Sequence, residues 1–137
     1  MATPVSVTLA AEDGVPIAAV RGEIDLSNVA DVRAAIAPAV TNAARALIVD
    51  LSETTYMDSR GVHLLFEIAD RLTRSQQHLI VVVPPASPIR RLLMITHFEQ
   101  AASVEATAGD AIARLSLTPS SPRRGEDGDQ GAQESGT

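Results

Sequence analysis

The sequence contains no cysteine, no lysine and no tryptophan, and each absence excludes a class of chemistry. Without cysteine the chain can form no disulfide, no thiolate metal site and no cysteine nucleophile. Without lysine it has no Schiff-base chemistry and no phosphate-binding lysine of a P-loop. Because it has one tyrosine and two phenylalanines, its core must be built from valine, isoleucine, leucine and alanine.

Long apolar runs and metal-ligand spacings are also missing. No run approaches the roughly 20 apolar residues that cross a bilayer. The N-terminus has neither the basic nor the apolar segment of a signal peptide, so we expect a cytoplasmic protein with no membrane partner. The net charge of −6 argues against nucleic acid, whose phosphates need a basic surface. The histidines His63, His78 and His97 are too widely spaced to predict a metal site, and we expect no metal or cofactor.

What is present is a regular alternation of strand and helix patterns in a chain of 137 residues, which predicts one domain. Two strand-like stretches joined by a glycine-containing turn predict an N-terminal β-hairpin. Further strands and helices are predicted from apolar periodicity and from helix start signals. The expected strands are residues 5–9, 15–20, 46–49, 79–83 and 101–104, and the helices begin at Ser27–Asn28, Ser59, Ser87–Pro88 and Thr107.

This order predicts an α/β fold with a mixed, mainly parallel sheet of about five strands and about four helices. The Ser27–Asn28 side chains are expected to accept the free N–H groups of the first helix, which Pro38 should kink or end. Ile89, Leu92, Leu93 and Ile95 are expected on the buried stripe of the third helix. We expect one domain over 1–117, followed by a disordered acidic tail over 118–137.

The stretch from Asp50 to Gly61, DLSETTYMDSRG, is the most informative part of the chain. It is expected to run as a loop from a buried strand to a helix, with an exposed Ser59 at the junction. Ser59 is interpreted as a helix N-cap contributing about 1 kcal/mol. It is also a candidate phosphoacceptor, because a helix N-terminus favours a phosphate. Asp58 is expected either to bond loop amides or to place Ser59. Asp50 is expected to form either a helix-facing hydrogen bond or one to a loop amide.

Three motifs in this order carry a resemblance to a known family: Arg21-Gly22-Glu23-Ile24-Asp25, Leu47-Ile48-Val49-Asp50-Leu51-Ser52 and Met57-Asp58-Ser59-Arg60-Gly61. A weaker match is Ile89-Arg90-Arg91-Leu92-Leu93, followed by Thr96 and Phe98. Over about residues 5 to 117 the chain resembles the STAS domain of bacterial anti-sigma-factor antagonists. The resemblance implies a STAS-like fold and a protein that binds other proteins rather than an enzyme.

The resemblance also implies a switch. In the family, the serine at the position of Ser59 is phosphorylated by an anti-sigma factor that is also a serine kinase. The unphosphorylated protein binds that factor and frees the sigma factor, and a metal-dependent serine phosphatase resets the switch. The residues expected at the partner-binding surface are Asp25, Ser27, Asp58, Ser59, Arg60 and His63. We expect a monomer when the protein is free.

Three alternatives remain at this point. The family commonly has a small residue at the position of Arg60 and often glycine at that of His63, so a STAS scaffold that is never phosphorylated is one alternative. A serine hydrolase would use Ser59 with His63, but Met57 replaces the first glycine of the G-x-S-x-G motif. A phosphoacceptor receiver domain would use Asp50. Such a site needs an acidic cluster and normally a lysine, and this chain has no lysine.

Overall fold

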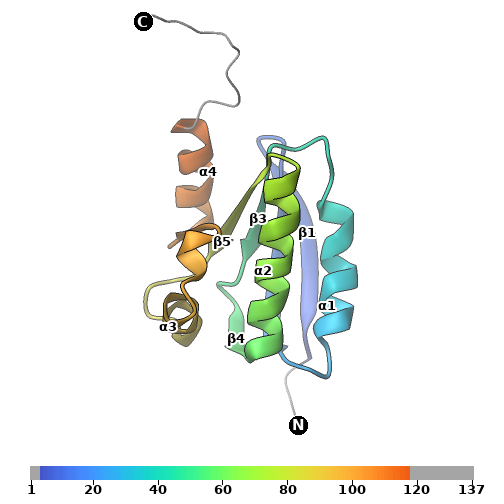
Figure 1. Cartoon of the computed structure of the whole chain (residues 1–137), viewed down its shortest axis with the longest axis vertical. Coiled ribbons are helices and arrows are strands. Elements are labelled where there is room, and N and C mark those ends of the chain that lie inside the picture. The colour runs from blue at the N-terminus through green and yellow to red at the C-terminus, as the bar shows by residue number, and fades with distance from the viewer. Residues whose placement is uncertain (1–3, 118–137) are drawn as a thin grey trace, which may run out of the picture.

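The protein is described by a computed structural model, which covers residues 4–117. Strands and helices alternate along the chain, and the strands form one mixed sheet of order β1-β2-β3-β5-β6, with β4 paired to β2 (Figure 1). The strands are β1 (Ser6–Glu12), β2 (Val15–Ile24), β3 (Ala46–Asp50), β4 (Thr54–Met57), β5 (His78–Val82) and β6 (Ser103–Glu105). The helices are α1 (Val29–Ile36), α2 (Ser59–Arg74), α3 (Pro88–Ile95) and α4 (Ala108–Leu117), with 3-10 turns η1 (Ala37–Ala39) and η2 (Phe98–Gln100).

The predicted hairpin is confirmed. β1 and β2 pair antiparallel from Ser6↔Arg21 to Glu12↔Val15. The two residues between them, Asp13 and Gly14, both have positive φ, as a two-residue hairpin turn requires. The remaining strand pairs are parallel. The fold class predicted from the sequence is therefore correct, whereas the predicted tail over 118–137 lies outside the described residues.

Two predictions about the strands were wrong. β2 continues to Ile24, although the strand was expected to cover residues 15–20 only. The expected loop between Asp50 and Asp58 contains β4, which pairs with the second half of β2 in parallel. β4 was missed because only its first and last residues are buried, so it shows no apolar alternation. The long strand β2 thus has β3 and then β4 along the same side.

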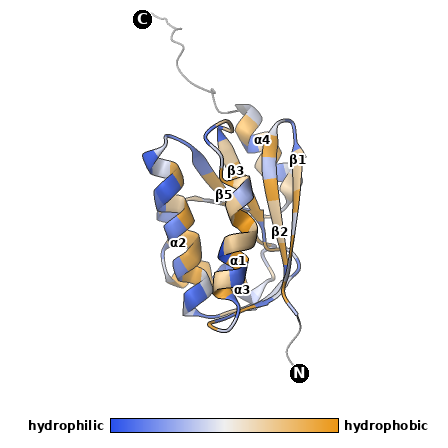
Figure 2. Ribbon diagram, turned by 90° about the vertical axis from the view of Figure 1, so that its right-hand side faces the viewer, coloured by the Kyte–Doolittle hydropathy of each residue, from blue (hydrophilic) through white to orange (hydrophobic). Residues whose placement is uncertain are grey.

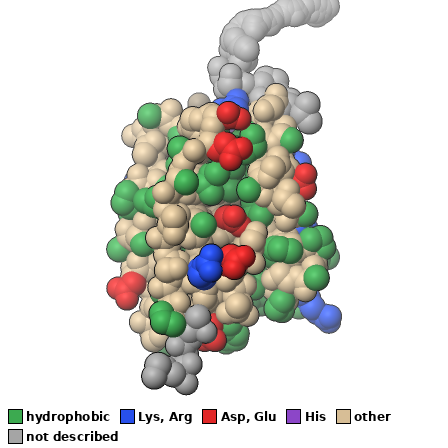
Figure 3. Space-filling view, turned by 180° about the vertical axis from the view of Figure 1, so that it is seen from behind, with side chains coloured by type: hydrophobic (Ala, Val, Ile, Leu, Met, Phe, Trp, Pro, Cys, Tyr) green, Lys and Arg blue, Asp and Glu red, His purple; other side chains and the backbone are tan. Residues whose placement is uncertain are grey.

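The sheet is covered unequally on its two faces. Helices α1, α2 and α3 turn their apolar sides to one face and enclose the main core, as Figure 2 shows for α1 and α2. Helix α4 covers part of the other face, where Ala111 and Leu115 pack on Ile48 and Ile80. Seen from behind, the molecule shows acidic and basic side chains among uncharged surface and no continuous basic band (Figure 3). Among the described residues, no helix is long and apolar enough to cross a membrane.

The helix ends test several predictions. Ser87 caps α3 as predicted, because its Oγ accepts the N–H of Ile89 at 3.1 Å. Helix α1 ends at Ile36, and Pro38 lies in the 3-10 turn that follows, as predicted. The prediction that the Ser27 and Asn28 side chains cap α1 was wrong. Oδ1 of Asn28 accepts the N–H of Asp25, and the Ser27 hydroxyl donates to the Asp25 carboxylate.

One prediction about α3 was also wrong. Ile95 was expected on the buried stripe of this helix, but it is 65% exposed. Ile89 and Leu93 are buried as predicted, and Leu92 is half-buried. Helix α3 therefore has a narrower buried face than its composition indicated.

Candidate functional site

The site is built at the N-terminus of α2, where the chain leaves β4. The backbone N–H of Asp58 donates to the carbonyl oxygen of Ile24 at the end of β2, at 3.2 Å. Asp58 is extended and is the N-cap, since its Oδ1 accepts the N–H of Arg60 at 2.9 Å. The prediction that Ser59 is the N-cap was therefore wrong by one position. The prediction that a helix begins at Ser59 is confirmed, since Ser59 is the first residue of α2.

Gly61 lets α2 approach the sheet closely at this end. It is buried, and a Cβ at its position would lie 2.4 Å from Cγ of Met57 and 3.2 Å from Cγ2 of Ile24. Real Cβ atoms do not approach other heavy atoms at the shorter of these distances. The glycine thus sets the height of the first turn of α2 above the ends of β2 and β4. That turn carries Ser59.

A second loop is tied to the same carboxylate. Oδ2 of Asp58 accepts the N–H of Leu26 at 3.3 Å, which connects the loop after β2 to the start of α2. In that loop, Oδ1 of Asp25 accepts the backbone N–H of Ser27 at 2.9 Å and its hydroxyl at 2.5 Å. Asp58 therefore bonds loop amides, one of its two predicted roles. Asp25 caps its own turn.

Ser59 itself has no structural partner. Its side chain is exposed, and its hydroxyl makes no hydrogen bond to any of the described residues. It lies at the positive end of the dipole of a helix of 16 residues. The hydroxyl is therefore free to meet a partner without disturbing a bond within the fold.

A shallow groove of about 320 Å³ runs from Ser59 between α2 and α3. Its lining includes both apolar and polar side chains. From α2 and its cap they are Asp58, Ser59, Val62, His63 and Phe66, and from α3 and its C-cap they are Leu92 and Thr96. The sequence did not identify Val62, Phe66, Leu92 or Thr96 as site residues. The spacing of Val62 and Phe66 marked them only as core positions, and nothing local joined α3 to α2.

The structure brings the predicted partner-binding residues to one end of the molecule. Asp58, Ser59 and His63 line the groove. Asp25 and Ser27 lie in the loop that the N–H of Leu26 ties to Asp58. Arg60 is exposed in the first turn of α2 but is not among the residues that line the groove. Leu26, which the sequence did not identify, is 65% exposed beside them.

The nucleophile–base pair of a serine hydrolase is not formed among the described residues at this end. A nucleophilic serine needs a base within hydrogen-bond reach, and His63 makes no hydrogen bond to Ser59. Oδ1 of Asp50 accepts the N–H and the hydroxyl of Ser52, at 2.9 and 2.6 Å, as predicted for a loop-amide bond. Within residues 4–117, no group of three or more histidine or acidic residues could hold a metal ion.

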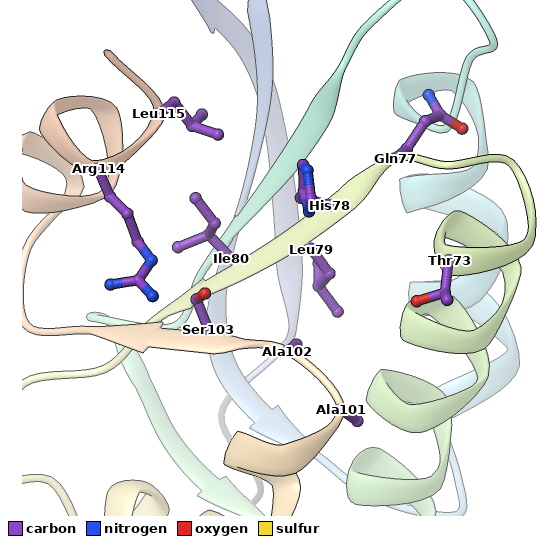
Figure 4. A pocket seen from close by; sticks show the side chains of 10 residues that line it. All are labelled: Thr73, Gln77, His78, Leu79, Ile80, Ala101, Ala102, Ser103, Arg114 and Leu115. Atoms are coloured by element: carbon purple, nitrogen blue, oxygen red, sulfur yellow. The ribbon is translucent and has the colours of Figure 1, made fainter. Parts of the chain in front are cut away.

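A separate cavity of about 300 Å³ lies at the other end of α2 (Figure 4). It is lined from the end of α2, from β5 and β6, and from α4, with Thr73, His78, Ser103 and Arg114 among its polar residues. Arg114 forms an ion pair with Glu105 at 3.2 Å. Since a helix rises about 1.5 Å per residue, the length of α2 separates this cavity from Ser59.

Comparisons with known proteins identify the family and the fold. The family model for the STAS domain matches residues 6–111. The anti-sigma-F factor antagonist RsfB of Mycobacterium tuberculosis is 29% identical over 108 residues, covering 79% of this chain and 87% of RsfB.

Solved structures share the fold. An anti-sigma factor antagonist from Mycobacterium paratuberculosis superposes with a TM-score of 0.75 at 24% identity, covering 85% of this chain and 99% of that one. SpoIIAA in its unphosphorylated form gives 0.66 at 22% identity, covering 83% and 99%. The Bacillus protein SpoIIAA in its phosphorylated form gives 0.59 at 23% identity, covering 80% and 99%. At these identities the superpositions establish the fold alone.

Proposed function

Because the chain belongs to the STAS domain family, we propose that it is an anti-sigma factor antagonist. It binds an anti-sigma factor and thereby frees the sigma factor that this factor holds. The name of its relative RsfB supports this function. The partner is an anti-sigma factor with serine kinase activity, which phosphorylates Ser59, and a serine phosphatase restores the hydroxyl. The free antagonist is a monomer.

The single observation that carries the switch is the state of the Ser59 hydroxyl. It is exposed at the first position of α2 and has no hydrogen bond to the described residues. Phosphorylation therefore breaks no bond within the fold, and the positive end of the helix dipole favours the added anion. The fold survives modification, so the change falls on the binding surface.

The modified surface differs in charge and in bulk. A phosphate adds about −1.5 to −2 charges at neutral pH. It adds them beside Asp58, at the rim of the groove between α2 and α3. A partner surface matched to a neutral hydroxyl rejects this form by repulsion and by steric conflict. The switch acts on binding and leaves folding unchanged.

The other site residues contribute to docking. Leu26 presents an exposed apolar side chain on the loop that Asp25 and Asp58 hold in place. Ser27 lies in the same loop, and Arg60 and His63 lie within the first two turns of α2. The proposed interface therefore has an apolar contact beside a polar, switchable one.

A scaffold that is never phosphorylated is the second candidate. The observation that favours it is the side chain of His63, which is 75% exposed at the rim of the groove next to Ser59. On this alternative, the bulky side chain keeps a kinase active site away from Ser59. This scaffold would bind its partners with an unmodified Ser59.

Intact mass separates the two candidates. The protein is incubated with candidate anti-sigma kinases and ATP, and a gain of one phosphate that Ser59→Ala abolishes supports the switch. Ser59→Asp should lose anti-sigma binding and keep its fold. Ser116→Asp, which adds the same charge to an exposed position on α4, is the matched control and should bind normally. Retained binding by Ser59→Asp, or binding with no phosphate incorporated, would favour the scaffold.

A further inference from the structure

His63 lies one helical turn after Ser59 on the same side of α2. Residues four apart on a helix are neighbours, with Cβ atoms about 5–6 Å apart. Both side chains line the groove between α2 and α3. Arg60, the other basic residue of this first turn, does not line it. His63 is thus the basic side chain that shares the groove with the Ser59 hydroxyl.

The present partner of His63 is weak. Its Nε2 lies 4.0 Å from Oε1 of Glu67, one turn further along α2. The Glu67 carboxylate already accepts two hydrogen bonds from Arg33 of α1, at 3.0 and 3.1 Å. The guanidinium offsets the negative charge of Glu67, and the His63 side chain is 75% exposed. Little therefore holds the imidazole on the Glu67 side.

We propose that His63 is the charge partner of the phosphoryl group on Ser59, and that it makes the phosphorylated state sensitive to pH. This inference rests on the proposed phosphorylation of Ser59. A protonated imidazole donates from both ring nitrogens and reaches a phosphate one turn toward the helix start. Phosphorylation draws His63 away from Glu67 and toward Ser59.

The charges around His63 support this assignment. The N-cap Asp58 and Glu67 of α2 are negative and Arg60 of α2 is positive. Arg33 on α1 is bonded to Glu67. From α3 the groove receives Leu92 and Thr96, which carry no charge. The phosphate is therefore the largest new charge near His63. No charged side chain from α3 lines the groove and competes with His63 for the phosphate.

The direction of the pH effect follows from linkage. A neighbouring anion favours the charged form of an imidazole, so the phosphate and a protonated His63 stabilise one another. The imidazolium cancels part of the phosphate charge, and the phosphate takes up its own second proton near pH 6. The charge that repels the partner therefore shrinks as pH falls from 8 toward 6. Phosphorylation should block binding strongly at pH 8 and less strongly at pH 6.

A protein with phosphoserine incorporated at position 59 during synthesis tests this without any kinase. The His63 ring signals are titrated by NMR in the phosphorylated and unmodified proteins, with His78 and His97 as internal references. His63→Gln assigns the signal. We expect phosphorylation to raise the proton affinity of His63 about three- to tenfold, as one unit of pKa is tenfold. The two references should not move, and an unchanged His63 titration overturns the proposal.

Binding of the anti-sigma factor provides the second measurement. The ratio of the affinities of the unmodified and phosphorylated proteins should rise between pH 6 and pH 8, and His63→Gln should flatten that rise. Equal pH profiles with and without His63 also overturn the proposal. The proposed function and this interaction can fail separately. If phosphoserine at position 59 raises the proton affinity of His63, but no kinase adds a phosphate to Ser59, the proposed function is refuted and the interaction with His63 stands.

Discussion

Replacing Gly61 by alanine tests the way in which α2 is seated on the sheet. The new Cβ would lie 2.4 Å from Cγ and 3.1 Å from Sδ of Met57, a side chain that is 5% exposed. Carbon atoms normally approach to about 3.5–4.0 Å, so more than 1 Å of overlap must be relieved. Either Met57 moves inside a filled core or the first turn of α2 rises.

The magnitude is set by two opposing effects. Alanine favours a helix over glycine by about 1 kcal/mol. Overpacking a filled core costs about 1–3 kcal/mol. We expect the core effect to win, since the new Cβ also meets Cγ2 of a second buried residue, Ile24, at 3.2 Å. The free energy of unfolding should fall by about 1 kcal/mol.

Urea unfolding followed by circular dichroism measures this change, and Gly109→Ala is the matched control. Gly109 is exposed in α4, and its nearest neighbour to a new Cβ is Oγ1 of Thr107 at 3.7 Å, an ordinary contact. That variant should be more stable by up to about 1 kcal/mol. If Gly61→Ala is stabilised to the same extent, the close approach does not restrict α2.

A double-mutant cycle strengthens the test. Met57→Ala alone should destabilise the protein by about 2–5 kcal/mol, as expected for a buried methionine. It also removes the atoms that the new Cβ would meet. The double variant should therefore lose at least about 1 kcal/mol less than the sum of the single losses. Additive losses would contradict the contact.

Three further substitutions have distinct expected outcomes. Asp58→Ala removes the cap of α2 and the acceptor of the Leu26 N–H. It should lower the free energy of unfolding in urea by about 1–2 kcal/mol and weaken partner binding. An unchanged stability and an unchanged affinity would refute the role of this carboxylate. Ser59→Ala should leave stability within about 0.5 kcal/mol, because its hydroxyl has no internal partner; a larger loss would reveal a structural role. Gly22→Ala places a Cβ 2.5 Å from the carbonyl oxygen of Pro4, at a position where the φ of Gly22 is +104°. The melting temperature should therefore fall by several degrees. An unchanged melting temperature would contradict this backbone contact.

The elements with a clear apolar period were predictable. Helix α2 repeats buried residues on one side, and β3 and β5 are continuous apolar runs. β4 was not predictable in this way, because its exposed middle residues hide the strand and its pairing with Gly22–Ile24 comes from a distant segment. Its existence depends on the length of β2, which the sequence understated.

The candidate site was predictable in its position but not in its details. Asp58 and Ser59 are both good N-cap residues, and the local sequence does not choose between them. The choice comes from the bond between the Asp58 N–H and the Ile24 carbonyl, which starts the helix at Ser59. The groove needed α3, whose Leu92 and Thr96 reach it only through tertiary packing.

The unbonded hydroxyl of Ser59 has an evolutionary consequence. Neither the Asp58 cap nor the Gly61 contact uses the Ser59 side chain, so the fold imposes almost no selection on this position. A lineage can therefore lose or regain a modifiable residue here in one mutational step without passing through an unstable intermediate. Regulation can diverge among descendants of this domain while the architecture that displays it stays the same.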